Sequence, residues 1–191
     1  MPNSKTPRIK KPITRWILWG IVPLFLVGSP LHFLFDWTGK IPFVGIFVPV
    51  SESVWEHLKL AFWPVLIWWV VGYFIFRKKN SIPVAKWFTS TVVALVTSTL
   101  VIVVIFYTYT GAFGIESLAI DILSLLAAIA AGQFLALHFY RRATFIKCNC
   151  WLYVSIAVIA LLIAVFICFT FFAPHIPIFR DSVSGTYGIR F

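Results

Sequence analysis

Five long apolar stretches constrain this chain more than any other feature of its sequence. They cover residues 16–35, 60–76, 87–107, 115–140 and 151–172. About 20 apolar residues in a helix, at 1.5 Å per residue, cross the roughly 30 Å hydrocarbon core of a bilayer. The stretches lack the period-two alternation of membrane β-barrel strands. The sequence therefore predicts an all-α integral membrane protein with a bundle of five transmembrane helices, forming a single domain over residues 16–173.

Composition agrees with this prediction. The chain has 191 residues, of which 61% are hydrophobic and 12% are charged, and this balance excludes an ordinary soluble domain. The first apolar stretch follows a basic tail, as the core of a signal peptide does. It is long and continues through GSPLHFLFDW without a small-residue cleavage pattern, so we expect it to remain as an uncleaved span.

The basic residues predict an orientation. They cluster in the N-terminal tail, around 77–86 and in 141–147, and these segments alternate with loops that hold few Lys or Arg residues. The positive-inside rule then predicts a multi-pass plasma-membrane protein with a cytoplasmic tail at 1–15 and an extracytoplasmic tail at 174–191. The net charge of +10 is explained largely by this orientation. We expect attraction to anionic lipid at the cytoplasmic face and no nucleic-acid partner, because combined aromatic and Arg platforms are absent.

Acidic residues and histidines gather on the opposite, outer side. All six acidic residues and three of the four histidines fall there, and they are Asp36, Glu52, Glu56, Glu116, Asp121, Asp181, His32, His57 and His175. His32 and Asp36 follow Ser29 at helical spacing, and Asp121 lies inside the fourth stretch, where an ionisable group normally faces the bundle interior. We predict one site built from His32, Asp36, Glu52, Glu56, His57 and Asp121. Glu116, His175 and Asp181 are further candidates.

Each of these residues also has a structural interpretation. Ser53 and Glu56 have the spacing of a capping box at a helix start, and Lys59 either extends toward the interface or pairs with Glu56. His32 and Asp36 fit interfacial groups at the end of the first span. Cys148 and Cys150 are expected to be free thiols, because the predicted topology places them on the reducing side.

Three segments resemble an uncharacterised family of small integral membrane proteins from Gram-positive bacteria. They are HFLFDW (32–37), PVSESVWEHLKLAFWP (49–64) and PHIPIFRDSVSGTYGI (174–189). The family is similar in its E-S-x-W-E-H-x-K block and its D-x-x-x-G-x-Y-G ending, although Ser51 here stands where the family has Asn. The resemblance implies a bacterial plasma membrane and draws attention to the outer segments. It implies no activity.

Three functions remain open from the sequence. The first is a ligand-binding or accessory membrane component with a His/carboxylate site at the outer end. The second is a metal-dependent hydrolase acting at the outer leaflet, with zinc favoured by the mixture of imidazole and carboxylate, although no H-E-x-x-H motif is present. The third is a proton- or cation-coupled transporter that works as an oligomer. A homo-oligomer or a membrane partner protein is compatible with all three.

Overall fold

The computed structural model describes residues 11–80, 82–146 and 148–189. This part of the chain contains helices and no strand, apart from an isolated antiparallel bridge between Arg180 and Tyr187. The helices in chain order are α1 (Lys11–Trp19), α2 (Ile21–Leu31), α3 (Leu34–Trp37), α4 (Pro42–Gly45), α5 (Val54–His57), α6 (Lys59–Asn80), α7 (Val84–Phe113), α8 (Leu118–Arg142), α9 (Cys150–Phe171) and the 3₁₀ turn η1 (Pro177–Phe179).

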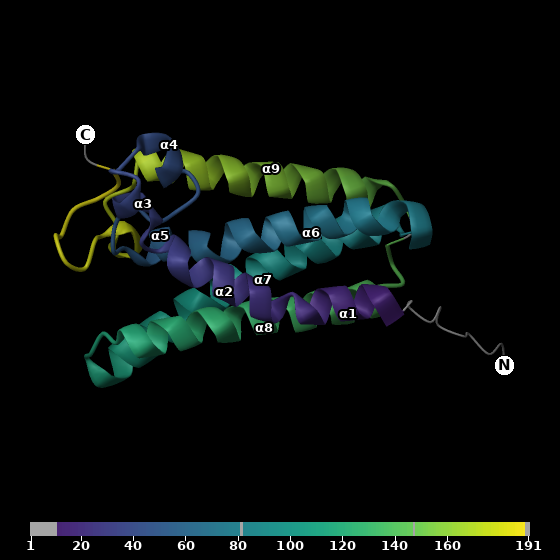
Figure 1. Cartoon of the computed structure of the whole chain (residues 1–191), viewed down its shortest axis with the longest axis horizontal. Coiled ribbons are helices and arrows are strands. Elements are labelled where there is room, and N and C mark those ends of the chain that lie inside the picture. The colour runs from purple at the N-terminus through teal and green to yellow at the C-terminus, as the bar shows by residue number, and fades with distance from the viewer. Residues whose placement is uncertain (1–10, 81, 147, 190–191) are drawn as a thin grey trace.

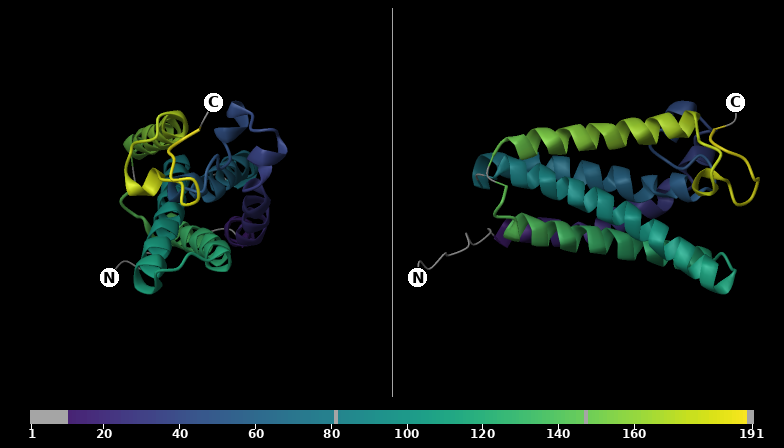
Figure 2. Two further views of the ribbon diagram at one scale, coloured as in Figure 1. Left: turned by 90° about the vertical axis from the view of Figure 1, so that its left-hand side faces the viewer. Right: turned by 180° about the vertical axis from the view of Figure 1, so that it is seen from behind.

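The long helices lie side by side in one bundle with two different ends (Figure 1). Residues 32–57, the α7–α8 connection and the segment after α9 gather at one end, which we call the polar end (Figure 2). The start of α1 and the α6–α7 and α8–α9 connections lie at the opposite end, which we call the basic end. The two ends thus separate the acidic and histidine-rich segments from the Lys- and Arg-rich ones.

Within the residues that the structure describes, five helical segments are long and apolar enough to cross a membrane. They are Lys11–Leu31, Val54–Lys78, Val84–Phe113, Leu118–Arg142 and Cys150–Phe171. Their number and order confirm the five long apolar helices that the sequence predicts. Large apolar side chains on their outer faces are exposed, among them Leu100, Val104 and Leu161, as expected for helices whose surroundings are lipid.

The first span begins and ends earlier than the predicted 16–35. It starts at Lys11 and stops at Leu31, and a turn separates α2 from α3. Pro30 lacks a backbone N–H, and the amides of His32 and Phe33 bond three residues back, His32 to Ser29 over 3.4 Å and Phe33 to Pro30 over 3.1 Å. These short-range bonds tighten and end the helix. His32 consequently sits in a turn rather than within a continuous helix.

Glycine and proline often interrupt helices, and two such residues in this bundle, Gly20 and Pro64, have different effects. The boundary between α1 and α2 falls at Gly20, where an added Cβ would lie 2.5 Å from the indole nitrogen of Trp68 on α6. Glycine therefore allows the two helices to approach closely at this break. In contrast, α6 continues as one helix through Pro64.

Helices α7 and α8 cross closely in the bundle. A Cβ at Gly132 would collide with the Ser98 hydroxyl and lie 2.8 Å from the Ala94 carbonyl oxygen. One residue further on, the buried Gln133 side-chain oxygen accepts a 3.1 Å hydrogen bond from the Trp69 indole. Small residues and interhelical hydrogen bonds are the contacts that join helices in lipid.

Two features of the basic end bear on the sequence predictions. The expectation of free thiols at Cys148 and Cys150 is wrong, because the structure joins them in a disulfide, while Cys168 is free and exposed. Residues 1–10 of the predicted cytoplasmic tail, and Lys147 of the third basic segment, lie outside the described residues.

Candidate functional site

The site begins with the start of α5. Ser53 has extended backbone angles, and its hydroxyl accepts a 3.3 Å hydrogen bond from the Glu56 amide. Ser53 is therefore the N-cap that the sequence predicts. The reciprocal half of the capping box is absent here, since the Glu56 carboxylate instead accepts from the Val50 amide at 3.0 Å and from the Lys59 ammonium.

Lys59 and Glu56 form a fully buried ion pair at this helix start. Lys59 is 0% exposed and Glu56 is 2% exposed. The ammonium donates to Glu56 Oε2 at 2.5 Å and to the Gly45 carbonyl oxygen at 2.7 Å, and lies 3.5 Å from the Val48 carbonyl oxygen. Charged donors of this kind need close acceptors when they are removed from water. The pair therefore ties the segment that leads into Glu52 to the start of α6.

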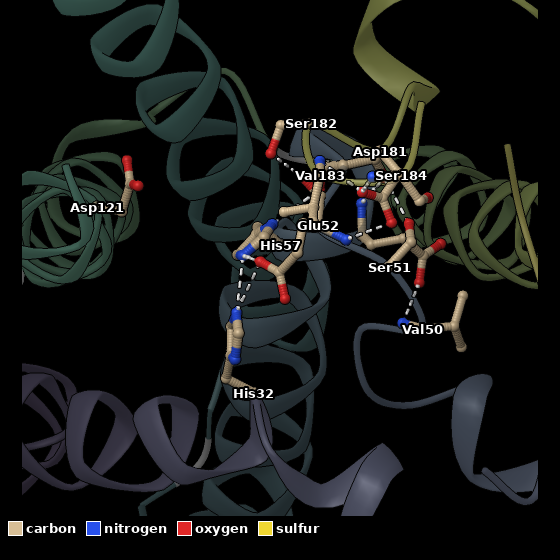
Figure 3. A network of polar contacts seen from close by, with 12 residues as sticks. His32, Val50, Ser51, Glu52, His57, Asp121, Asp181, Ser182, Val183 and Ser184 are labelled. Atoms are coloured by element: carbon tan, nitrogen blue, oxygen red, sulfur yellow. Dashed lines mark hydrogen bonds and ion pairs between the residues drawn. The ribbon is translucent and has the colours of Figure 1, made fainter. Parts of the chain in front are cut away.

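His32, Glu52 and His57 converge at the polar end, and we call them the triad (Figure 3). The two histidine Nε2 atoms lie 3.0 Å apart. Glu52 Oε2 lies 3.3 Å from Nε2 of His32 and 3.4 Å from Nε2 of His57. The three atoms thus form a nearly equilateral triangle, supplied by the turn after α2, the loop before α5 and α5 itself. All three side chains are partly accessible, with exposures of 19%, 44% and 25% in sequence order.

The protonation states suit a metal ligand set. His57 Nδ1 lies 2.8 Å from the Ser53 carbonyl oxygen, which can only accept, so Nδ1 carries the hydrogen. In the neutral ring, Nε2 then has a free lone pair that can bind a metal, whereas in the protonated ring Nε2–H donates to Glu52. Contacts with the His32 imidazole, and next with the His57 imidazole, hold the pKa of the Glu52 carboxyl far below its usual range and outweigh burial, which raises it. Glu52 is therefore ionised at neutral pH.

The segment after α9, residues 172–189, holds the backbone of Glu52, and we call it the tail. The Glu52 amide donates to Asp181 Oδ2 at 3.3 Å, and the Ser182 hydroxyl donates to the Glu52 carbonyl oxygen at 3.4 Å. Asp181 also accepts from the amides of Val183 at 2.8 Å and Ser184 at 2.9 Å. Burial raises the pKa of Asp181, but these backbone N–H donors outweigh it and place the pKa below its usual range.

Asp36 and Asp121 lie outside the triad. Asp36 is on α3 beyond the turn that ends α2, where it lies 3.8 Å from the exposed Lys40 ammonium. Asp121 accepts a 2.8 Å hydrogen bond from the Tyr109 hydroxyl and stands on α8 away from the triad (Figure 3). The predicted stripe of His32 and Asp36 is broken because the first helix ends between them.

The remaining candidates occupy other parts of the polar end. Glu116 is exposed in the α7–α8 connection and lines a recess that also borders Glu52. His175 is exposed in the tail, with its ring 4.5 Å from that of Tyr187. Sequence reasoning did not single out Arg180, which lines the same recess. The sequence feature that could have drawn attention to Arg180 is that it is a basic residue in an outer segment, where Lys and Arg are otherwise few.

Comparison with known proteins identifies a family and no activity. A model described as a family of unknown function, DUF6512, matches residues 5–189, nearly the whole chain. The chain belongs to this family. No curated protein and no solved structure shows significant similarity to it. Membership agrees with the expected uncharacterised family, so function has to be argued from the site itself.

Proposed function

We propose that this protein is a membrane protein that binds a divalent transition metal, preferably zinc, through His32, Glu52 and His57. The observation that carries the proposal is the spacing of the three ligand atoms. Zinc bonds of 2.0–2.1 Å at tetrahedral angles separate the ligand atoms by about 3.3–3.4 Å. The triad distances of 3.0, 3.3 and 3.4 Å are close to this separation.

The donor set supports the choice of metal. Two imidazole nitrogens and one carboxylate oxygen suit zinc, whereas calcium and magnesium prefer oxygen ligands alone. The Ser53 carbonyl orients His57 through Nδ1, as outer partners of metal-bound histidines commonly do. Asp36, Glu56 and Asp121, which the sequence grouped with these ligands, have other partners and are left out of the proposed set.

Metal analysis of the purified protein tests this proposal. Protein in detergent, stripped with chelator and reloaded, is expected to retain about one equivalent of zinc. His57→Ala and Glu52→Gln should each lower zinc affinity by at least about tenfold. His175→Ala and Asp36→Asn are matched controls, because both remove a similar group at the polar end outside the triad. Equal zinc binding by the triad variants and the controls would refute the assignment.

A metal-dependent hydrolase is the second candidate, and the number of ligands favours it. Structural zinc sites are closed by four protein ligands, whereas catalytic sites have three and keep one position for water. The triad supplies three ligands. Cobalt substitution tests this idea: the visible spectrum should change when a hydroxamate is added if a position is open. A spectrum that stays unchanged would argue for a binding or accessory role without hydrolysis.

We propose the bacterial plasma membrane as the location, with the polar end outside and the basic end in the cytoplasm. Five apolar helices and the separation of charges between the two ends support this placement. Transport by an oligomer has less support. Among the side chains that the structure describes, the buried acidic and basic ones are Glu56, Lys59 and Asp181, all near the polar end, so no chain of buried acidic or basic groups continues through the bundle.

A further inference from the structure

A recess of about 420 Å³ opens between the tail and the end of α7. Its lining includes four charged side chains and three aromatic ones, namely Glu52, Glu116, Arg180 and Asp181 with Phe106, Tyr107 and Tyr187. Ligand sites in proteins generally fall between about 300 and 1,000 Å³, so the recess has room for a small polar group. It borders the triad only through Glu52.

Two opposite charges are available to a ligand in the recess. Glu52 is engaged by the two histidines, and Asp181, which also lines the recess, accepts three backbone N–H groups. Glu116 and Arg180 are exposed and have no ion pair or side-chain hydrogen bond with any described residue. One cation from the tail and one anion from the α7–α8 connection therefore face the same recess from separate elements.

The aromatic walls and the neighbouring surface of α7 suit an amphiphile. Aromatic faces attract ammonium groups. From Tyr107, an exposed apolar stripe continues along α7 through Val104 and Leu100, at spacings of three and four residues that put them on one helix face. Their exposed fractions are 43%, 61% and 57%. An acyl chain along this stripe would place its head group at the recess.

We propose that the recess binds the head group of a zwitterionic phospholipid, with the phosphate on Arg180, the ammonium on Glu116 and a chain along the α7 stripe. A soluble phosphodiester can carry the same pair of groups, a phosphate joined to an ammonium. The apolar stripe on α7 favours the lipid over the soluble compound, because only the lipid has an acyl chain to cover it. This inference goes beyond the metal site, and binding in the recess requires no metal.

Binding of short-chain lipids to the purified, metal-free protein tests the inference. Dihexanoyl phosphatidylethanolamine should bind about two- to fivefold more tightly than dihexanoyl phosphatidylglycerol, the range expected for one exposed ion pair. Glu116→Gln should remove this preference. Arg180→Gln should weaken both lipids. Asp36→Asn, which removes an exposed acid elsewhere at the polar end, should change neither affinity.

Three results would overturn the proposal. The first is equal affinity of the unsubstituted protein for the two lipids, and the second is a preference for phosphatidylethanolamine that survives Glu116→Gln. The third is binding of glycerophosphoethanolamine as tight as that of the lipid, because this would assign the recess to a soluble ligand. His57→Ala separates this inference from the metal proposal. It should lower zinc affinity by at least about tenfold and leave the lipid preference intact, so either proposal can fail alone.

Discussion

The backbone N–H of Glu52 donates to the carboxylate of Asp181, 129 residues later in the chain, over 3.3 Å. The neighbouring Ser182 hydroxyl reaches the carbonyl of the same glutamate. Since the Glu52 side chain faces His32 and His57, this residue is held by its backbone on one side and by the triad on the other. The tail is thus a supporting layer for the proposed metal site.

Removing this support should weaken metal binding. Asp181→Ala deletes the acceptor for the Glu52 amide, so we expect the dissociation constant for zinc to rise by about tenfold, the lower range for outer-layer partners of metal ligands. Competition with a chelating indicator measures it. Asp36→Ala is the control, because the ion-pair partner of its carboxylate among the described residues is the exposed Lys40. An Asp181→Ala protein that binds zinc like the control would show that the tail does not position Glu52.

The docking of the tail should depend on pH through Asp181. The folded-state pKa of this carboxyl is depressed from an ordinary value of 3.8. The contribution of Asp181 to the stability of the docked tail is therefore complete at neutral pH. It is lost as the pH falls below about 4 and through the depressed folded-state pKa. A spin label at Val183→Cys, in a protein without its native cysteines, should become mobile in that range. With Asp181→Asn it should be mobile at every pH. If the mobility of the label rises near pH 6 instead, a histidine rather than Asp181 would control the docking of the tail.

The buried pair of Glu56 and Lys59 should be a stability determinant of the polar end. Lys59→Met leaves the Glu56 carboxylate buried without its ammonium, which costs about 3–5 kcal/mol of unfolding free energy. Glu56→Gln combined with Lys59→Met should recover much of that loss, since neither charge then remains. Denaturant unfolding in mixed micelles measures both.

The matched control for the buried pair is Lys40→Met. Lys40 is 72% exposed and pairs with Asp36, so its loss should change the unfolding free energy by less than about 1 kcal/mol. A Lys59→Met protein as stable as Lys40→Met would mean that the pair contributes nothing. A double variant as unstable as the single one would mean that packing, rather than charge, is the cause.

The number and length of the apolar stretches were sufficient to predict the bundle. The five spans follow directly from apolar stretches that no soluble domain would tolerate, and the alternation of basic and acidic segments agrees with the two ends. The sequence also predicts Ser53 as an N-cap, because a capping hydrogen bond joins residues within four positions of each other. Features that depend only on neighbours in the sequence can be predicted from it.

The composition of the site was harder to predict, since it depends on where helices end in space. Asp36 shares a helical stripe with His32 only if the first helix continues, and the turn after Pro30 removes that assumption. Glu56 has the spacing of a capping box, yet its carboxylate points to Lys59 and Val50. The link from Asp181 to Glu52 joins residues that are 129 positions apart and has no local signal.

The crossing of α7 and α8 should be sensitive to a single methyl group. Gly132→Ala places a Cβ against the Ser98 hydroxyl and 2.8 Å from a backbone oxygen that cannot move freely. We expect a loss of about 1–3 kcal/mol in unfolding free energy, typical of overpacking. Gly111→Ala is the control, because nothing lies within 4 Å of a Cβ there. It should be neutral or stabilising by up to about 1 kcal/mol. Similar effects at both positions would contradict a close crossing.

Labelling of single cysteines tests the orientation of the bundle. In a protein without native cysteines, Val183→Cys lies in the exposed tail at the polar end, with the original side chain 83% exposed. Thr144→Cys is exposed in the α8–α9 connection at the basic end. The positive-inside rule places the basic end in the cytoplasm. A membrane-impermeant maleimide added to intact cells should therefore label position 183 and reach position 144 only after permeabilisation. The opposite pattern would reverse the orientation and move the triad and the recess to the cytoplasmic face.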